Sequence, residues 1–213
     1  IPQGFIAYLN YKLSKTPYVI TTHGGDIFGL QGKFMTYVKK ITLKNAKKVT
    51  VVSNAIKNEI HEKIDSNLKI EVIPMGVDSK LFNPNKKDLS IKKKFGINGP
   101  FLLFVGRLAE KKGVKYLLEA MPKVIQNFPT TKLIIIGTGT LESELKRLAK
   151  DLKIEENVIF TGAIENSKLP KYYATADIFI GPSIQTKEGD REGLPVSLME
   201  AMASGCIVIT TNL

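Results

Sequence analysis

The sequence contains one cysteine, Cys206, and no apolar run long enough to cross a membrane. A lone cysteine cannot form an intrachain disulfide or a CxxC metal or redox motif. A membrane-spanning helix needs about 20 consecutive apolar residues, and no secretory signal pattern opens the chain. We therefore expect a cytoplasmic protein, at most peripheral to the inner face of a membrane.

Arginine is missing from residues 1–98, which carry 17 lysines and 7 acidic residues and so a net charge of +10. Residues 99–213 carry 14 basic and 13 acidic residues. A basic half can meet nucleic acid, anionic lipid or a phosphorylated substrate, although a lysine excess that only favours solubility explains it equally well. No aromatic residues alternate with the lysines as in compact nucleic-acid motifs, so nucleic acid is not expected as a partner.

Apolar strands alternate with amphipathic helices along most of the 213 residues, of which 43% are hydrophobic. This rhythm predicts an α/β fold with parallel sheets that are covered on both faces. A polar, lysine-rich stretch at 78–98 predicts a linker between two halves, 1–77 and 99–213. We expect strands at 18–22, 49–52, 69–73, 101–105, 132–136, 158–160, 177–180 and 206–210, and helices at 33–45, from 54, around 114–121, 141–152, 168–174 and 195–203.

The loops that follow these strands are the expected ligand sites, because open parallel sheets bind ligands at the carboxyl ends of their strands. Arg107 and Lys112 lie in GRLAEKKG at 106–113, just before a predicted helix, and two cations beside helix-end amides suit a diphosphate. Two plain surface cations are the alternative. Glu192 lies just ahead of a second predicted helix, at 195–203, and Glu200 follows about two turns on. Their carboxylates can accept hydrogen bonds from sugar hydroxyls. Tyr172 and Tyr173 are expected to pack in the core.

The chain resembles the retaining glycosyltransferases of family 4, which have the GT-B architecture of two Rossmann-like parallel-sheet domains. The resemblance is carried by HGGD at 23–26, VIPMGVDSKLF at 72–82, GRLAEKKG at 106–113, IIIGTGTLESEL at 134–145, FTGAI at 160–164 and EGLPVSLMEAMASG at 192–205. It implies that residues 1–77 are the last part of an N-terminal acceptor-side domain, which is incomplete. Residues 99–213 are then a C-terminal donor domain that is truncated at its end.

The resemblance also implies a role for individual positions. Arg107 and Lys112 match the pair that holds the donor diphosphate, together with Gly106, and stabilises charge on the leaving phosphate. Glu200 matches the acid on the donor ribose, and Glu192 the acid that contacts the hexose. The remaining matches are Gly193 and Leu194 as amide donors near the sugar and phosphate, Gly162 and Ile164 beside the nucleobase, His23 as the histidine that reaches the donor sugar, and Asp26 without an assigned role.

The resemblance implies a hexosyltransferase that retains the anomeric configuration and needs no metal or cofactor. No Asp-x-Asp and no cysteine and histidine cluster offers a metal site in the sequence. The expected partners are a UDP- or GDP-sugar donor, a sugar or lipid-linked acceptor, and an anionic membrane surface. Because elements of the family are missing at both ends, we expect this segment alone to be inactive.

Three alternatives stay open on the sequence alone. The first is a non-catalytic module that binds a nucleotide or nucleotide sugar. The second is a basic domain that binds nucleic acid or anionic lipid, and only the charge of residues 1–98 supports it. A dinucleotide-dependent dehydrogenase is disfavoured, because Gly137-Thr138-Gly139 lacks the third glycine of the expected spacing.

Overall fold

The computed structural model describes residues 2–29, 32–190 and 192–212. Within it the chain forms two compact units. The first comprises residues 1–75 and 185–194, and the second comprises residues 76–184 and 195–213. The segment 185–194, which the sequence analysis places in the donor half, therefore groups with the first unit.

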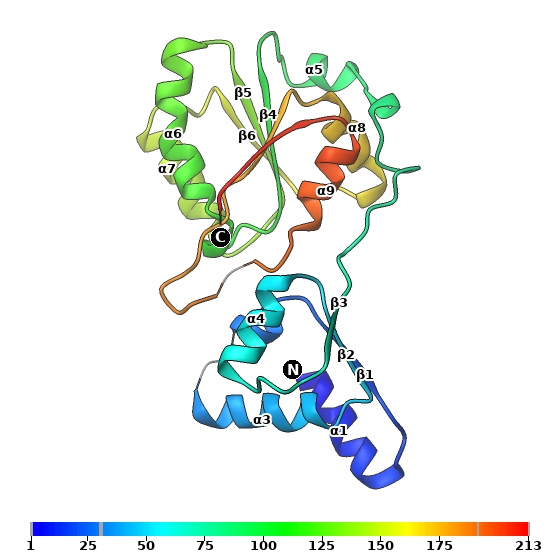
Figure 1. Cartoon of the computed structure of the whole chain (residues 1–213). Helices are drawn as coiled ribbons and strands as arrows, with labels where there is room; N and C mark the ends of the chain where they lie inside the picture. Colours follow the sequence, from blue (N-terminus) through cyan, green and yellow to red (C-terminus); the bar gives the residue numbers. More distant parts are fainter. Residues whose placement is uncertain (1, 30–31, 191, 213) are drawn as a thin grey trace. The chain divides into compact units, whose positions relative to one another are not determined.

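The first unit is a three-stranded parallel sheet with helices around it (Figure 1). Its strand order is β1-β2-β3. Helix α4 packs on β2 and β3, and α1 packs against α3. The elements are α1 (Pro2–Ser14), β1 (Val19–Thr22), α2 (Gly25–Phe28), α3 (Lys33–Lys44), β2 (Lys48–Val51), α4 (Asn54–Lys63) and β3 (Ile70–Val72).

The core of the first unit lies between β2 and the helices α3 and α4. Ser53 begins α4 as expected, because its hydroxyl accepts a hydrogen bond from the Ile56 amide at 3.4 Å. Val51 and Ile56 are fully buried. The short strand thus supplies apolar side chains to the core, and the cap sets where the covering helix starts.

The second unit is a five-stranded parallel sheet of order β6-β5-β4-β7-β8. Three short 3-10 helices, η1 (Pro84–Lys86), η2 (Glu110–Lys112) and η3 (Asn166–Lys168), lie in its connections. The other elements are α5 (Ser90–Lys94), β4 (Phe101–Val105), α6 (Val114–Asn127), β5 (Lys132–Ile136), α7 (Glu142–Asp151), β6 (Val158–Gly162), α8 (Leu169–Thr175), β7 (Ile178–Gly181), α9 (Val196–Ala203) and β8 (Ile207–Thr210).

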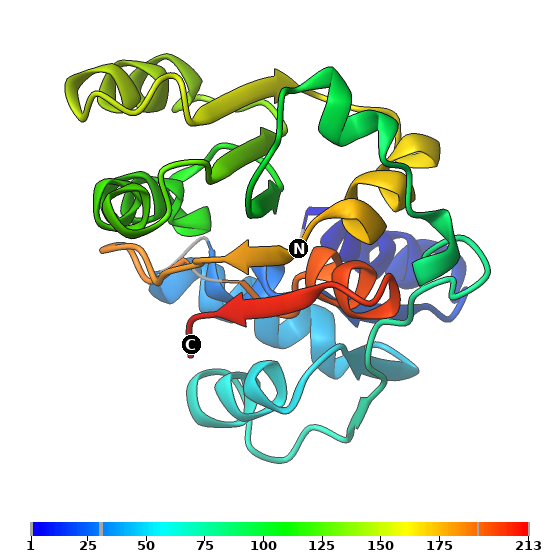
Figure 2. The same ribbon diagram turned by 90° about the horizontal axis from the view of Figure 1, so that it is seen from above.

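Helices cover both faces of this second sheet, with α6 and α7 on one side and α8 and α9 on the other (Figures 1 and 2). Alternate residues of β4 face the two layers: Leu102 and Phe104 pack with α6 and α7, whereas Phe101 and Leu103 pack with α8 and α9. The expected α/β fold with doubly covered parallel strands is confirmed.

Residues 78–98, predicted as a linker, are packed onto the second unit. Phe82, Ile91 and Ile97 are buried in the core beneath α8. The segment also forms the short helix α5, on which Ile91 lies. The apolar residues are too widely spaced among lysines to indicate a helix or strand. The sequence analysis also gave no helix at α1 or α2.

Truncation of the buried Leu118 on α6 should destabilise the second unit. Leu118 is fully buried, so Leu118→Ala should cost about 2–5 kcal/mol through lost burial and a residual cavity. Tyr116 on the same helix is 54% exposed, and Tyr116→Ala serves as the control. Urea denaturation of both variants measures the difference, and equal losses would contradict the packing of α6.

Candidate functional site

The carboxyl ends of the central strands in the second unit are joined by backbone hydrogen bonds. The Gly106 amide donates to Ile136 O at 3.0 Å, and the Gly137 amide donates to Gly162 O at 2.9 Å. Gly137 has φ 138°, and a Cβ there would lie 1.9 Å from Gly106 O. The loops after β4, β5 and β6 therefore form one tightly packed edge, at which Gly106 and Gly162 come together.

Arg107 and Lys112 lie in the loop between β4 and α6. Arg107 lies two residues after the end of β4 and is exposed, whereas Lys112 is half-buried in η2. The Lys112 side chain crosses Gly106, since its Cε lies 3.6 Å from the place of a Cβ on that glycine. Lys112 thus stands at the amino end of α6, directly before its cap Gly113, where helix dipole and amides favour an anion, and Arg107 lies in the loop that leads to it.

The loop that contains Lys112 packs against the residues that follow β7 and is hydrogen-bonded to them. The Ile184 amide donates to Lys111 O at 2.9 Å. Gly113 has φ 65° and caps α6, and a Cβ on it would lie 1.8 Å from Pro182 O. Only glycine allows this close approach, so the position of Lys112 depends on Gly113.

Glu200 on α9 is held by a buried tyrosine. The Tyr173 hydroxyl donates to Glu200 Oε2 at 2.8 Å. Tyr173 is fully buried, with its ring against Phe82 and Phe179. Burial, and next the Glu200 carboxylate, raise the pKa of Tyr173 far above its usual range, so the hydroxyl keeps its proton.

The sequence analysis assigned Tyr173 to packing alone, and this interpretation was incomplete. Its ring does pack in the core, but its hydroxyl also orients a candidate site carboxylate. No spacing in the sequence pairs residues 27 positions apart, so the partnership appears only in the folded chain.

Gly162 is the last residue of β6, and Ile164 follows in the next loop, beside a small pocket. Gly162 has φ 71°. The pocket has a volume of about 430 Å³, and Tyr172, which packs in the core, also forms part of its wall. Its other walls are Lys94, Phe95, Ile159, Phe160, Thr161, Ala163, Ile164, Glu165 and Lys168. A cavity with both apolar and polar walls lies where the sequence predicts the nucleobase.

His23 and Asp26 share a turn in the first unit, just after β1. His23 is exposed, and the His23 backbone amide donates to Asp26 Oδ2 at 3.2 Å. Gly24, with φ 110°, lies between them. The carboxylate of Asp26 therefore holds the backbone that presents the histidine.

The segment with Glu192, Gly193 and Leu194 packs on this same turn. A Cβ on Gly193 would lie 2.5 Å from His23 O, and Leu194 packs against the core of the first unit. The structure thus brings Glu192–Leu194 together with His23. In the second unit, Gly106, Arg107, Lys112 and Gly162 lie in the joined loops after the strands, Ile164 lines the pocket after β6, and Glu200 lies on α9 beside Tyr173. The functional assignments of all these residues stay predictions.

A buried lysine, which the sequence analysis did not single out, supports the turn. Lys39 on α3 is 3% exposed, and its Nζ donates to Ile27 O at 2.7 Å and Gly29 O at 2.8 Å. Burial lowers the pKa of Lys39 below its ordinary value. These bonds fix the end of α2, which lies two residues after Asp26. Among so many surface lysines, nothing in the sequence marks this one as buried.

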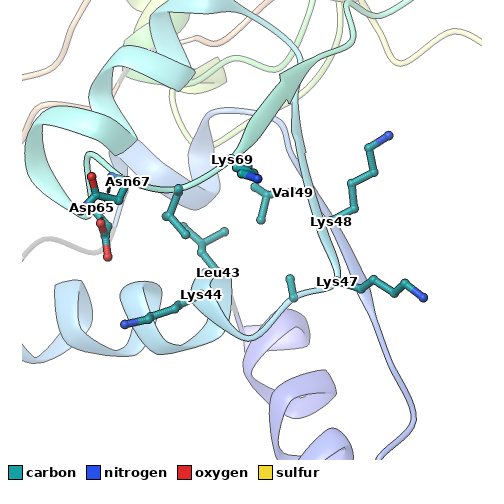
Figure 3. A pocket seen from close by; sticks show the side chains of 10 residues that line it. Leu43, Lys44, Lys47, Lys48, Val49, Asp65, Asn67 and Lys69 are labelled. Carbon is teal, nitrogen blue, oxygen red and sulfur yellow. Dashed lines mark hydrogen bonds between the residues drawn. The ribbon is translucent and has the colours of Figure 1, made fainter.

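Lysines gather at the opposite edge of the first sheet, around a pocket of about 380 Å³ (Figure 3). Lys47 precedes β2 and Lys48 begins it, Lys69 precedes β3 and Lys44 ends α3. Lysines near helix ends complement the negative end of the helix dipole. The three strands are parallel, so their amino ends lie at one edge of the sheet and their carboxyl ends at the other. The lysines lie at the amino-end edge, whereas His23 follows the carboxyl end of β1.

Residues 2–29, 32–190 and 192–212 contain no helix that is long and apolar enough to span a bilayer. They also contain no group of three or more histidine, cysteine, aspartate or glutamate side chains that could hold a metal ion. The expectation that no metal or cofactor is needed stays a prediction.

Two family profiles match this chain. "Glycosyl transferases group 1" matches residues 85–213, and "Glycosyltransferase Family 4" matches residues 2–81. The first alone covers more than half of the chain. The chain therefore belongs to the group 1 glycosyltransferases, the family that its sequence motifs resemble.

Relatives of known or assigned function include lipid glycosyltransferases. A GDP-mannose-dependent monoacylated alpha-(1-6)-phosphatidylinositol monomannoside mannosyltransferase of Corynebacterium glutamicum is 35% identical over 98% of this chain and 55% of its own length. A UDP-Gal:alpha-D-GlcNAc-diphosphoundecaprenol alpha-1,3-galactosyltransferase of Escherichia coli is 30% identical over 99% of this chain and 55% of its own length. The chain spans about half the length of these relatives.

Solved structures share the fold. Alr3699/HepE of Anabaena in complex with UDP-glucose has a TM-score of 0.82 at 20% identity, over 97% of this chain and 56% of its own. The sucrose-phosphate synthase of Thermosynechococcus elongatus has a TM-score of 0.79 at 23% identity, over 97% of this chain and 53% of its own. These likenesses confirm the GT-B type of fold, with its Rossmann-like parallel sheets.

Removal of the Lys39 amine should loosen the His23 turn. Lys39→Met keeps the apolar stem but leaves the carbonyls of Ile27 and Gly29 without this donor, at a cost of about 1–3 kcal/mol. The amides of α2 should then exchange with deuterium faster, by about 5- to 150-fold if α2 opens locally.

Lys40→Met is the control, because Lys40 is exposed on the same helix and forms an ion pair with Asp65 at 3.4 Å. Exposed ion pairs contribute about 0–1 kcal/mol, so exchange in α2 should change little. Equal exchange rates in the two variants would contradict the support role of Lys39.

Proposed function

We propose that this chain is part of a glycosyltransferase that moves a hexose from a nucleoside-diphosphate sugar to an acceptor hydroxyl, with retention of the anomeric configuration. The observation that carries the proposal is the packed edge of the second unit, where Arg107 and Lys112 share the loop that leads into α6. Family membership supports the transferase class.

The donor nucleotide is assigned to the second unit. Arg107 and Lys112 bind the diphosphate with the amides at the start of α6, because two cations and a helix end offset its charge. Glu200 accepts hydrogen bonds from the ribose hydroxyls, with the carboxylate oriented by Tyr173. Gly162 and Ile164 border the nucleobase, where the 430 Å³ pocket has room for a flat ring.

The hexose is assigned to residues of the first unit and its associated segment. Glu192 accepts hydrogen bonds from the sugar hydroxyls, and the amides of Gly193 and Leu194 donate to sugar or phosphate oxygens. His23 contacts the hexose beside the anomeric carbon, and Asp26 fixes the turn that presents it. These roles are carried over from the family resemblance, position by position.

The proposed reaction needs no metal ion. The bond between the anomeric carbon and the phosphate oxygen breaks, and the acceptor oxygen forms its new bond on the same face. The acceptor proton passes to the leaving phosphate, so charge and atoms balance. Arg107, Lys112 and the dipole of α6 stabilise the negative charge that grows on that phosphate.

A lipid-linked acceptor is supported by the names of the relatives. Those of Corynebacterium glutamicum and Escherichia coli include a phosphatidylinositol mannoside and a diphosphoundecaprenol as acceptors. We therefore place the whole protein in glycolipid or glycan synthesis, working in the cytoplasm at the membrane surface. The residues 1–213 alone are proposed to bind the donor without transferring it.

A non-catalytic module that binds nucleotide sugars is the second candidate, since the residues of the second unit that are assigned to the donor nucleotide would suffice for binding. Sugar transfer by the full-length protein discriminates between the two. A product with the donor's anomeric configuration, formed in the presence of EDTA, is expected. Inversion, or dependence on added Mg²⁺ or Mn²⁺, would contradict that part of the proposal.

Calorimetric titration of residues 1–213 with UDP, GDP and ADP tests the assignment of the donor nucleotide to the second unit. We expect one of the three to bind, and Lys112→Ala to weaken binding by about 10- to 150-fold, as for a lost charge-assisted bond of about 1.5–3 kcal/mol. Lys115→Ala is the matched control, because Lys115 is exposed three residues further on in α6. Equal effects of the two variants, or binding of none by a folded chain, would overturn the assignment.

Tyr173→Phe tests the assignment of Glu200. This variant keeps the packed ring and removes only the hydroxyl that donates to Glu200 Oε2. We expect the variant to bind the preferred nucleoside diphosphate about 5- to 30-fold more weakly, as for a hydrogen bond of about 1–2 kcal/mol.

The dideoxyribose form of the same nucleotide is the control ligand for this variant. Because it offers no ribose hydroxyls to Glu200, wild type and Tyr173→Phe should bind it equally. An equal loss for both ligands would instead mean that Tyr173 acts only through the packing of the second unit.

A further inference from the structure

Two glycines of the first unit lie against each other. Gly24 belongs to the turn that carries His23, and its partner belongs to segment 185–194, which groups with the first unit. A Cβ on Gly24 would lie 2.9 Å from the Gly193 nitrogen and 3.0 Å from the Gly193 Cα. A Cβ on Gly193 would lie 2.5 Å from His23 O. The two main chains are therefore in direct contact and leave no room for a side chain between them.

Helix α2 holds the turn in place. Gly24 O accepts hydrogen bonds from the amides of Ile27 and Phe28, each at 2.8 Å. The Phe28 side chain is buried in the core of the first unit, and Lys39 bonds the carbonyls at the other end of α2. The backbone of Gly24 is thus fixed, and its φ of 110° favours glycine even before the contact is considered.

The other side of the contact is held by the hydrophobic core. Gly193 lies between the His23 carbonyl and α4, since a Cβ on it would also lie 3.0 Å from Ile56 Cδ1. Ile56 is fully buried, and Leu194 packs against the same core. Because neither neighbour can yield in a closely packed interior, a methyl group at Gly193 must push the segment away from the turn.

Glu192, the carboxylate that is assigned to the hexose, lies between two fixed points. The chain before it closes into a turn, in which the Thr186 amide donates to Asp190 O at 2.9 Å. The residue after it is Gly193. The contact between the two glycines therefore controls where Glu192 lies relative to the turn that presents His23.

We propose that Gly24 is a positioning residue of the hexose site. Its missing side chain lets segment 185–194 pack on the turn, and this packing places Glu192 and His23 for the same hexose. Gly24 acts only through its backbone contact with Gly193. The proposal rests on the proposed function, because the hexose contacts of Glu192 and His23 are taken from there.

Hydrogen exchange in the full-length protein tests the contact. Gly193 has no positive φ, so Gly193→Ala adds a close contact without backbone strain. Gly24→Ala adds both. We expect each variant to speed the exchange of the amides of residues 192–194 by about 5- to 150-fold, as for overpacking that opens the contact locally. Gly193→Ala decides this test if Gly24→Ala does not fold.

Two other glycines of the first unit provide matched controls. Among the described residues, a Cβ on Gly32 or on Gly25 would meet no heavy atom within 4 Å. Gly32 has φ 118°, so Gly32→Ala adds strain without a contact, whereas Gly25→Ala adds neither. Neither control should speed exchange at residues 192–194.

Sugar transfer by the full-length protein separates positioning from a general loss of stability. We expect Gly24→Ala and Gly193→Ala to lower kcat/KM for the nucleotide sugar about 100-fold, as for reacting groups misplaced by about 1 Å. Affinity for the free nucleoside diphosphate should be unchanged, because that ligand has no hexose. Gly25→Ala and Gly32→Ala should keep the kcat/KM of the wild type.

Three results would contradict the positioning role. Unchanged exchange in Gly24→Ala and Gly193→Ala would mean that the contact does not hold the segment. Faster exchange with the kcat/KM of the wild type would mean that the packing does not serve the hexose site. An equal loss of affinity for the free nucleoside diphosphate would mean that the substitutions only destabilise the protein. The wild type distinguishes the two proposals: if it transfers hexose and the variants match it, the positioning role alone fails, whereas a wild type without transfer overturns the proposed function and the positioning role together.

Discussion

The close approach of backbone to backbone at the edge of the second sheet is the constraint on which the donor assignment depends. Gly137 lies against Gly106 O, and Gly139 lies against the backbone of Leu108. A side chain at either position would separate the loops after β4 and β5, and Arg107 would move with them. Because these loops are held by main-chain hydrogen bonds, the cations beside α6 are preorganised before any ligand arrives.

The sequence predicted the parallel strands well and the buried polar contacts poorly. Strand β4 was placed with its observed bounds, because FLLFV is an apolar run between a proline and a glycine. Ser53 was correctly placed as the start of a helix for a similarly local reason. The family motifs located the candidate residues along the chain. They could not show that segment 185–194 packs with the first unit, since that depends on contacts between distant residues.

Two buried polar side chains, Lys39 and Tyr173, support the candidate site without belonging to the motifs. Each donates to an acceptor supplied by another element: Lys39 to the carbonyls that end α2, and Tyr173 to the Glu200 carboxylate. A buried polar group is costly unless it is hydrogen-bonded, so these pairs restrict the position of the acceptor as well as the donor. In the sequence, one looks like a surface lysine and the other like a core aromatic residue.

The proposed donor site agrees with the uneven charge of the chain. In the second unit a diphosphate needs two cations at one place, and a generally basic surface would compete for it with unrelated anions. The near-neutral balance of residues 99–213 is therefore compatible with a selective donor site.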